Sequence, residues 1–405
     1  MSKRARFVLI SLSSLVVTYA LIGALLGKND DTRKTYRNLG VYSEVLSRIK
    51  MDYVVEPDMR KTTRGALRGL LESLDPYNTY FTAEEYRAYD QNKSGGPANL
   101  GLILWKRGYA AVISVVPGSP ADKAGLARGD MIETIDRAST RQLSLVQVMR
   151  LLQGPEGSEV NLVIIRQDRG ESQQLSLVRS KIQYPPVTTK WVKQGVGYLR
   201  VPSLEKGKAA EIRTKLKALI DGGAEKIVLD LRDCATGDSD ESTEVANFFI
   251  EHGLITFLEG QRFPRQESVA DAGKSFCKLP LVVLINGSTA GPAEILASAL
   301  MENERGKLVG QRSFGVGSVQ RIIPLDDGDA LLLSVAKYHS PSGIKIQDEG
   351  VKPNVEAVLE IDRDTDAEKT DLNARPRLRD RFNTEDDTQL HKALEVLEES
   401  LPQAA

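Results

Sequence analysis

The first 30 residues are dominated by one long apolar run. Residues 7–27 contain no charged side chain, and Lys3, Arg4 and Arg6 precede them. About 20 apolar residues span a bilayer, and basic flanks stay on the cytoplasmic side. The pattern predicts an uncleaved single-pass anchor in residues 1–30, with the rest of the chain across the membrane. A cleaved signal peptide is the alternative, although the run is long for one.

Helical spacing of apolar residues follows in residues 31–93. Two runs each place their apolar side chains on one helical face, which holds Val41, Val45, Leu46 and Ile49 in the first and Leu67, Leu70, Leu71 and Leu74 in the second. The pattern therefore predicts a helical arm. Packing or dimerisation is the most that its residues support.

Residues 94–183 change to a β-type pattern after a Gly-Gly-Pro loop. Short apolar runs occupy residues 100–105, 110–116, 130–136 and 160–166. A helix between the last two runs would turn Leu145 and Val148 inward. The pattern predicts a small, mostly β domain.

Strands and helices alternate in residues 184–358. The pattern predicts helices at 208–221, 240–252 and 292–301, and strands at 196–203, 226–232, 279–287, 307–312, 319–325 and 329–339. Continuous apolar runs such as KIVLDLR are typical of strands buried on both faces. The segment is therefore an α/β domain by pattern. Residues 359–405 start as a charge-rich linker and end in a short helix with Leu390, Leu394 and Leu397 on one face.

Composition narrows the functions. The chain has 405 residues, enough for two or three domains, and a net charge of −1, which gives no sign of a nucleic-acid partner. Three His and two Cys exclude a multi-ligand zinc site built on those residues. We expect no metal and no cofactor. Cys234 and Cys277 either form a disulfide or stay unpaired, and the sequence leaves both open.

The run VVPGSPADKAGLARGDMIETID, residues 115–136, resembles a PDZ domain. Its strand, small-residue turn, short helix and Gly-Asp turn follow in the PDZ order. The resemblance places Leu100, Gly101, Leu102 and Ile103 at the carboxylate-binding loop and the strand after it. Successive backbone N–H groups there can bind a terminal carboxylate, and the strand edge can accept a peptide. A non-binding spacer of the same fold is the alternative.

Six further motifs, in order, resemble the carboxyl-terminal processing peptidases, also called tail-specific proteases. They are GALRGLLESLDPYNTYFTAEEY (65–86), GYLRVPSL (197–204), KIVLDLR (226–232), AEILASAL (293–300), GQRSFGVGSVQ (310–320) and YHSPSGIKIQDEGVKPNV (338–355). The resemblance implies an α/β + β fold: a transmembrane helix, a helical arm, and a PDZ domain inserted before an α/β core of the ClpP/crotonase-like type. It also implies a bacterial inner-membrane protein with its bulk in the periplasm.

The resemblance also implies a Ser–Lys dyad, because a serine hydroxyl is a weak nucleophile that needs a neighbouring base. The nucleophile falls on Gly291 and the base on Val316, and the interval of 25 residues matches the family. Gln320 matches the glutamine that supports the lysine. Glycine has no side chain and valine accepts no proton, so both members of the dyad are missing.

The oxyanion loop is altered as well. After LDLR the family has Asn-Asn-Pro-Gly-Gly, and here the residues are Asp233, Cys234, Ala235, Thr236 and Gly237. Thr236 resists the positive φ angles that glycine allows. Backbone donors are still expected at Gly237, where the loss of one donor would cost about 10²- to 10³-fold in rate.

Relocated catalytic groups are the competing hypothesis. Ser288, Thr289, Ser318 and Lys307 lie near the two dyad positions in sequence, and Cys234 lies beside the oxyanion loop. A misplacement of about 1 Å can already cost roughly 100-fold in rate. His252, His339 and His391 have no acid partner at motif spacing.

The sequence therefore predicts a membrane-anchored pseudopeptidase. It would bind polypeptide C-termini or unfolded peptides through its PDZ domain and act as a regulator or scaffold at the inner membrane. Its expected assembly is a homo-oligomer or a complex with an active relative. The alternatives are an active serine-type endopeptidase with relocated catalytic residues and a purely structural oligomer with an empty PDZ groove.

Overall fold

The computed structural model describes residues 18, 30–91, 98–167, 172–358 and 387–399. The chain divides into two compact units, residues 1–67 and residues 68–405. Apart from Thr18 and Asp30, the predicted anchor lies outside the described residues, and among those that are described no helix has both the length and the apolar character to cross a membrane. The predicted linker lies outside them from residue 359 to residue 386.

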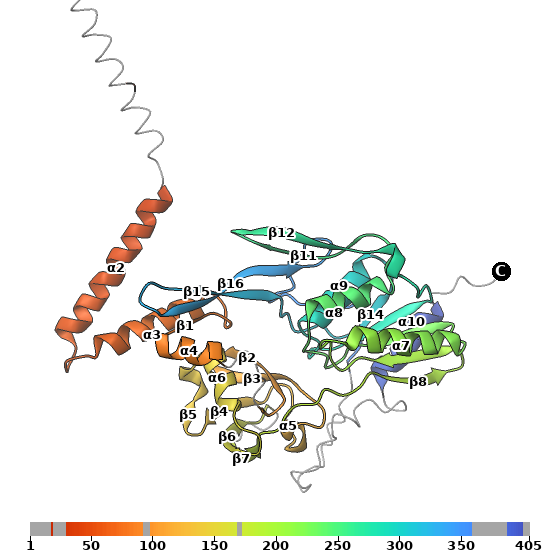
Figure 1. The fold of residues 1–405 in the computed structure, drawn as a ribbon, viewed down its shortest axis with the longest axis horizontal. Helices are drawn as coiled ribbons and strands as arrows, with labels where there is room; N and C mark the ends of the chain where they lie inside the picture. The colour runs from red at the N-terminus through yellow and green to blue at the C-terminus, as the bar shows by residue number, and fades with distance from the viewer. Residues whose placement is uncertain (1–17, 19–29, 92–97, 168–171, 359–386, 400–405) are drawn as a thin grey trace, which may run out of the picture. The chain divides into compact units, whose positions relative to one another are not determined.

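The first unit contains α2 (Asp30–Asp52) and the start of α3 (Met59–Glu72) (Figure 1). Val41 and Val45, which the periodicity places on an apolar face, are more than half exposed, at 55% and 51%. In the second unit Leu71 is buried, whereas Leu70 and Leu74 are exposed. The predicted leucine face is therefore only partly buried, because periodicity marks the apolar side of a helix and does not say how much of it is covered.

The predicted helical region is interrupted. Strand β1 (Thr79–Phe81) leaves the helical pattern and pairs with β16 (Ala330–His339), so that Phe81 lies opposite Ala330. Helix α4 (Ala83–Gln91) follows it. The strand was missed because its stability comes from pairing with residues 249 to 253 positions away in the chain, which local periodicity cannot register.

A small antiparallel sheet forms the PDZ-like domain. Its strand order is β2-β3-β4-β6-β7, with β5 paired to β4. The elements are β2 (Leu102–Arg107), β3 (Tyr109–Val115), α5 (Pro120–Lys123), β4 (Met131–Ile135), β5 (Ala138–Ser139), α6 (Leu145–Leu152), β6 (Glu159–Ile165) and β7 (Ser172–Val178). Leu145, Val148 and Leu152 of α6 are buried against the sheet, in line with the predicted inward face. Among the described strands, β2 is at one end of the sheet.

The α/β domain is built on a second sheet, of order β17-β14-β13-β10-β9-β8. All pairs are parallel except β8 with β9. The strands are β8 (Thr188–Lys193), β9 (Val196–Arg200), β10 (Lys226–Asp230), β13 (Leu281–Ile285), β14 (Lys307–Gly310) and β17 (Val355–Glu356). Every residue of β13 is buried, as its continuous apolar run predicts.

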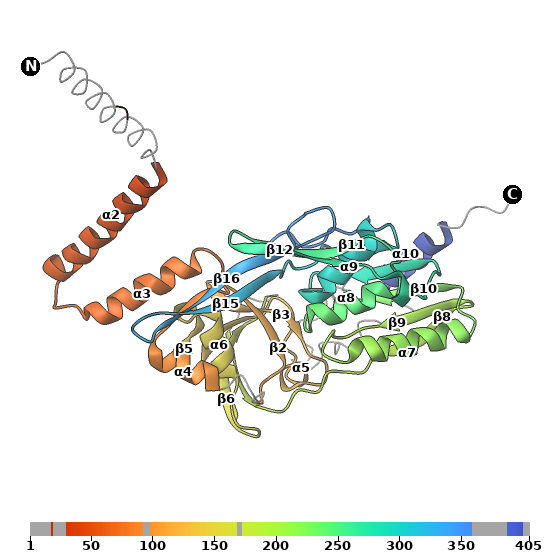
Figure 2. The ribbon, with the colours of Figure 1, turned by 45° about the horizontal axis from the view of Figure 1, so that its top comes forward.

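Helices cover both faces of this sheet (Figures 1 and 2). One face is covered by α7 (Lys208–Asp221), α8 (Ser239–Asn247) and α9 (Pro292–Glu302), and the other by α10 (Thr388–Glu399). Helix α8 ends five residues before the predicted end at 252, because Phe248, Phe249 and Ile250 turn into the core instead of continuing the helix. Helix α10 packs as an element of the core, with Leu390 and Leu397 buried.

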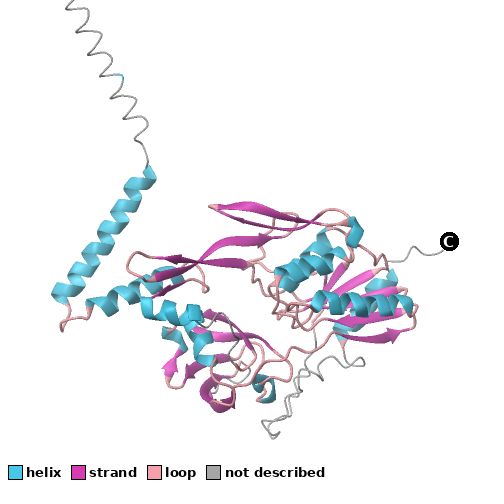
Figure 3. Ribbon diagram, viewed as in Figure 1, coloured by secondary structure: helices cyan, strands magenta, loops and turns pink. Residues whose placement is uncertain are grey.

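A third sheet, of order β1-β16-β11-β12 with β15 on β16, extends from the α/β core (Figure 3). Its further strands are β11 (Leu254–Gly260), β12 (Phe263–Val269) and β15 (Ser318–Pro324). The segment after Val316 forms β15, which pairs with β16, and β16 in turn pairs with β1. Because β16 pairs with both β1 and β11, it joins the helical region of the second unit to the α/β core.

Candidate functional site

Three loops meet beyond the carboxyl ends of the parallel strands. They follow β10, β13 and β14, which are neighbours in the sheet. The amide of Ala290 donates to the carbonyl of Cys234 at 3.0 Å, and the amide of Phe314 donates to the carbonyl of Thr289 at 2.9 Å. Ligand and active sites of open α/β sheets occur at this edge. The fold therefore gathers the predicted oxyanion, nucleophile and base loops in one place.

Glu294 of α9 connects the two dyad positions. Its Oε2 accepts from the amide of Gly291 at 2.9 Å and from the amide of Val316 at 2.7 Å. Its Oε1 accepts from the amide of Gly315 at 2.7 Å and from the hydroxyl of Ser313. Because one oxygen accepts from both amides, the backbone nitrogens of Gly291 and Val316 lie within two hydrogen-bond lengths of each other in space. The 25-residue spacing in the sequence therefore corresponds to proximity in space.

Gly291 has space for a side chain but an unfavourable backbone for one. A Cβ atom built at this position would meet nothing within 4 Å. Its φ is +62° and its ψ is −123°, a conformation that costs a residue with a side chain about 1–3 kcal/mol. Strained backbone of this kind is common at functional positions. Gly291 therefore combines a strained backbone with free space at the predicted nucleophile position, and it carries no nucleophilic group.

Pro292 follows the predicted nucleophile position, and it has no backbone N–H that could donate to an oxyanion. The sequence interpretation did not single out this residue. It is the first residue of α9. In serine hydrolases of the nucleophile-elbow type, the amide that follows the nucleophile donates to the oxyanion. Proline has no N–H to donate. The signal was present in the sequence, because a proline directly follows the predicted nucleophile position.

The oxyanion loop is held by side chains. Asp233 has a φ of +60° and is bonded twice to the side chain of Asn286. The Asp233 amide donates to Asn286 Oδ1 at 3.1 Å, and Asn286 Nδ2 donates to Asp233 Oδ1 at 2.9 Å. Gly237 has a φ of +138°, and a Cβ there would come within 2.2 Å of the Leu204 backbone. The positive φ angles thus fall on Asp233 and Gly237, so the expected strain at Thr236 does not arise.

The proposed substitutes for the nucleophile are engaged elsewhere. Ser288 Oγ is buried and donates to the carbonyl of Ile113 at 2.7 Å, and Thr289 Oγ1 donates to the carbonyl of Leu231 at 2.9 Å. Cys234 is fully buried, and this burial raises the pKa of its thiol. Cys234 and Cys277 are both free thiols. A low-pKa, accessible sulfur is what nucleophilic cysteines need.

Gln320 and Ser318 form a separate contact. The Nε2 amide of Gln320 donates to Ser318 Oγ at 2.8 Å and to Ser334 Oγ at 3.2 Å. Ser318 lies on β15 and Ser334 lies on β16. Gln320 therefore has partners that do not depend on a lysine at position 316.

The PDZ-like domain contacts all three loops. Ser114 Oγ donates to the carbonyl of Asp233 at 3.0 Å, and Ser288 donates to Ile113 as described. The rings of Trp105 and Phe314 meet edge-to-face with centroids 5.8 Å apart. Strands β2 and β3 thus lie directly on the site.

The predicted peptide-binding loop is already partly hydrogen-bonded. The amide of Gly101 donates to Asn99 Oδ1 at 2.8 Å, and Leu100 is buried. Gly101 has a φ of +76°, and a Cβ there would lie 2.3 Å from Ser119 Cβ, so glycine is required. Leu102 and Ile103 begin the edge strand β2. A terminal carboxylate at this loop would have to replace the Asn99 side chain at the Gly101 amide.

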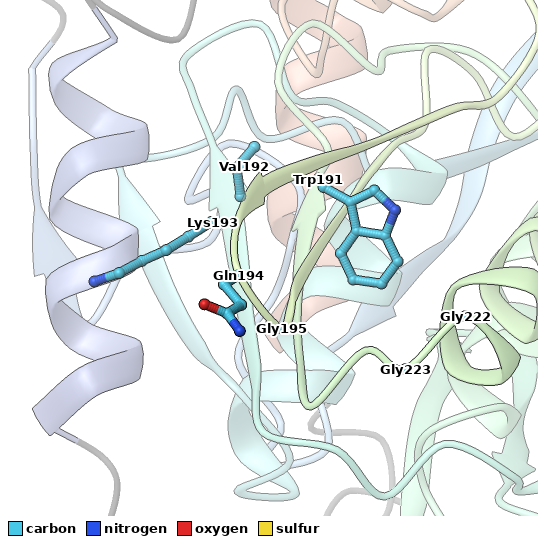
Figure 4. A pocket seen from close by; sticks show the side chains of 7 residues that line it. All are labelled: Trp191, Val192, Lys193, Gln194, Gly195, Gly222 and Gly223. Atoms are coloured by element: carbon cyan, nitrogen blue, oxygen red, sulfur yellow. The ribbon is translucent and has the colours of Figure 1, made fainter.

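A surface depression lies elsewhere, between the turn after β8 and the end of α7 (Figure 4). It is lined by Trp191, Val192, Lys193, Gln194, Gly195, Gly222 and Gly223. Lys193 points to α10 and pairs with Glu398 (Figure 4). None of the dyad or peptide-loop positions contributes to this depression.

The burial of Glu294 gives a pH prediction. Burial raises the pKa of Glu294 from 4.5 to about 7, even though its four hydrogen bonds favour the charged form. The folded state then binds this proton more tightly than the unfolded state, so the free energy of unfolding should fall as the pH rises from about 4.5 to about 7, by about 3 kcal/mol at most. Urea unfolding of the chain and of Glu294→Gln at pH 5 and pH 7.5 tests this. The variant should lack this part of the pH dependence, and equal slopes in the two proteins would contradict it.

The fold and the site together define a PDZ-containing protein of the serine-peptidase fold. Residues 195–357 match Peptidase family S41, and residues 112–166 match a PDZ domain. The chain is 31% identical over 335 residues to a carboxy-terminal-processing protease of Bartonella bacilliformis, covering 80% of this chain and 76% of the relative. It is 32% identical over 320 residues to the carboxy-terminal processing protease CtpA of Bacillus subtilis, covering 78% and 68%.

A solved structure agrees with these relatives. The photosystem II D1 C-terminal processing protease matches with a TM-score of 0.67 and 29% identity, over 78% of this chain and 86% of that chain. The chain therefore belongs to the family of carboxy-terminal processing proteases. The family resemblance predicted from the sequence motifs is confirmed.

Proposed function

We propose that this chain is a pseudopeptidase of the family, which binds polypeptide C-termini or unfolded peptides through its PDZ domain and does not cleave them. The observation that carries the proposal is the pair Gly291 and Val316, whose amides share one oxygen of Glu294. Because the two positions are adjacent in space, the absence of a hydroxyl and an amine there reflects a loss at the site and is not explained by a shifted alignment. Pro292, which cannot donate to an oxyanion, supports the same conclusion.

The proposed binding mode uses the edge of β2. An extended peptide can add to this strand, and its carboxylate can bind the amides of the loop at Leu100 and Gly101. Asn99 Oδ1 already accepts from the Gly101 amide, which shows that this N–H points to a position where an acceptor oxygen fits. A peptide carboxylate would substitute one acceptor for another.

The proposed setting is the outer face of a bacterial inner membrane. It rests on the apolar, uncharged residues 7–27 and the basic residues before them. There the protein would act as a regulator or scaffold, as a homo-oligomer or together with an active relative. The alternative of an active endopeptidase would require a relocated nucleophile, and the hydroxyls of Ser288 and Thr289 are committed to backbone carbonyls.

Peptide titration tests the proposal. A fluorescein-labelled octapeptide ending in Leu-Ala-Val is titrated with the full chain in detergent, and fluorescence anisotropy is measured beside its C-terminal amide. We expect carboxylate-dependent binding, weakened at least about tenfold by amidation, since hydrogen bonds to a charged acceptor contribute roughly 1.5–3 kcal/mol. The same preparation should leave an unfolded, labelled casein intact. Equal binding of both peptides would refute the binding mode, and casein cleavage that survives repurification would refute the pseudopeptidase.

A further inference from the structure

The N-terminal caps of two helices meet beside the PDZ-like domain. In α4, Glu85 Oε2 accepts from the amide of Thr82 at 2.9 Å, and Thr82 Oγ1 accepts from the amide of Glu85 at 3.3 Å. In α6, the same reciprocal pattern joins Ser144 and Gln147, at 3.0 Å and 3.3 Å. Such capping boxes satisfy the unpaired amides of a first helical turn. Here the two boxes are also bonded to each other, because Gln147 Nε2 donates to Glu85 Oε1 at 2.8 Å.

Two further contacts support this link to α6. Arg68 of α3 fixes Glu85, because Arg68 Nη2 donates to both carboxylate oxygens of Glu85, at 2.7 Å and 2.9 Å. Val146 packs in an apolar cluster with Phe81 of β1 and with Tyr86 and Tyr89 of α4. Helix α6 thus has two packed faces, one against the core of the PDZ-like domain and one against residues of α4 and β1. Helix α4 lies next to α6 in both views (Figures 1 and 2).

Helix α6 also borders the strand that the proposed peptide would join. It contacts β2 within the PDZ-like domain. A peptide added to β2 needs room between this strand and α6, so the position of α6 limits which peptides can enter. Residues that hold α6 therefore act on the groove without touching the peptide.

We infer that Glu85 and Gln147 are positioning residues for peptide binding: the bond between them lets α4 hold α6 at the distance from β2 that the peptide requires. This inference rests on the proposed function, because it assigns a role in the binding proposed there. It makes the helical segment before the PDZ-like domain part of the binding machinery. As caps, Glu85 and Gln147 each stabilise the first turn of their own helix. The hydrogen bond between the two side chains is a separate contact, which joins α4 to α6.

A charge swap separates this role from simple stabilisation. In Gln147→Glu, the new carboxylate still accepts from the Ser144 amide and so keeps the cap of α6, but it faces the carboxylate of Glu85. We expect binding of the octapeptide ending in Leu-Ala-Val to weaken about tenfold. In Glu85→Gln/Gln147→Glu, the amide and the carboxylate exchange places and the hydrogen bond between them re-forms, while the one amide oxygen at position 85 can still accept one of the two bonds that Arg68 donates to Glu85. Affinity should therefore return to within about threefold of the unaltered chain. Glu133→Gln, which removes one charge from β4, is the control and should bind as before.

Each outcome decides between the two proposals. If the unaltered full chain does not bind the peptide, both the binding mode and this inference are wrong. If it binds and Gln147→Glu binds equally well, with the fold intact by circular dichroism, only the inference is wrong. A weakened Gln147→Glu that the exchange does not rescue also overturns it, because the effect then comes from something other than the bond between the two side chains.

Discussion

A chain carrying Gly291→Ser and Val316→Lys together is expected to remain without measurable cleavage of an unfolded polypeptide. The two substitutions return a hydroxyl and an amine to positions whose amides share an oxygen of Glu294. The open space at Gly291 accommodates a serine side chain. The developing oxyanion, however, still lacks the donor that an amide at position 292 would supply, because residue 292 is proline.

Adding Pro292→Ala to this pair should make cleavage measurable, because one oxyanion donor contributes about 10²- to 10³-fold in rate. Release of fluorescence from labelled casein measures the rates. Gly291→Ala/Pro292→Ala/Val316→Lys, which lacks only the hydroxyl, is the matched control and should be inactive. A double variant as fast as the triple variant would show that Pro292 is not a limiting loss.

Glu294→Ala should be the most destabilising single substitution at the site. It removes the acceptor for the amides of Gly291, Gly315 and Val316 and for the Ser313 hydroxyl, all in a region closed to solvent. Each buried donor left without a partner costs about 1–3 kcal/mol. Because the loops can relax partly, we expect a loss of about 3–5 kcal/mol in the free energy of unfolding.

Urea unfolding at pH 7 measures this loss. Ser298→Ala is the control, because Ser298 is buried on the same helix but bonds only to the carbonyl of Ile295 within it. It should change the free energy of unfolding by less than about 1 kcal/mol. Similar losses in the two variants would mean that Glu294 does not link the nucleophile and base loops.

Packed elements of the α/β domain were predictable from local pattern. Helix α7 begins and ends where the apolar periodicity indicates, and the continuous apolar runs at β10 and β13 are buried strands. Strands β7, β8, β11 and β12 were not predicted. The exposed faces of β7, β8 and β12 carry polar side chains, as in Ser172–Val178, so their apolar signal is weak although pairing stabilises them. Strand β11 was missed although Ile255, Phe257 and Leu258 are apolar and buried.

The site was predictable to the extent that it rests on motif spacing. Gly291, Val316 and Gln320 could be assigned by counting residues, and the loops at the first two do meet in the structure. In the sequence, Glu294 was only one residue of the motif AEILASAL. Its part in joining the loops could not be inferred, because four donors from two separate segments converge on it only after the sheet has formed.

The sequence by itself determined the family and the prediction that Gly291 and Val316 stand at the dyad positions, since both depend on which residues stand at which spacing. Only the tertiary structure decided that Glu294 accepts from the amides of Gly291 and Val316. It also decided that the hydroxyls of Ser288 and Thr289 donate to backbone carbonyls, and that α4 and α6 are joined by a hydrogen bond. These contacts join residues distant in the chain. Hydrogen-bond partners and burial are properties of the packed molecule, and a local sequence pattern carries no record of which distant segment will supply them.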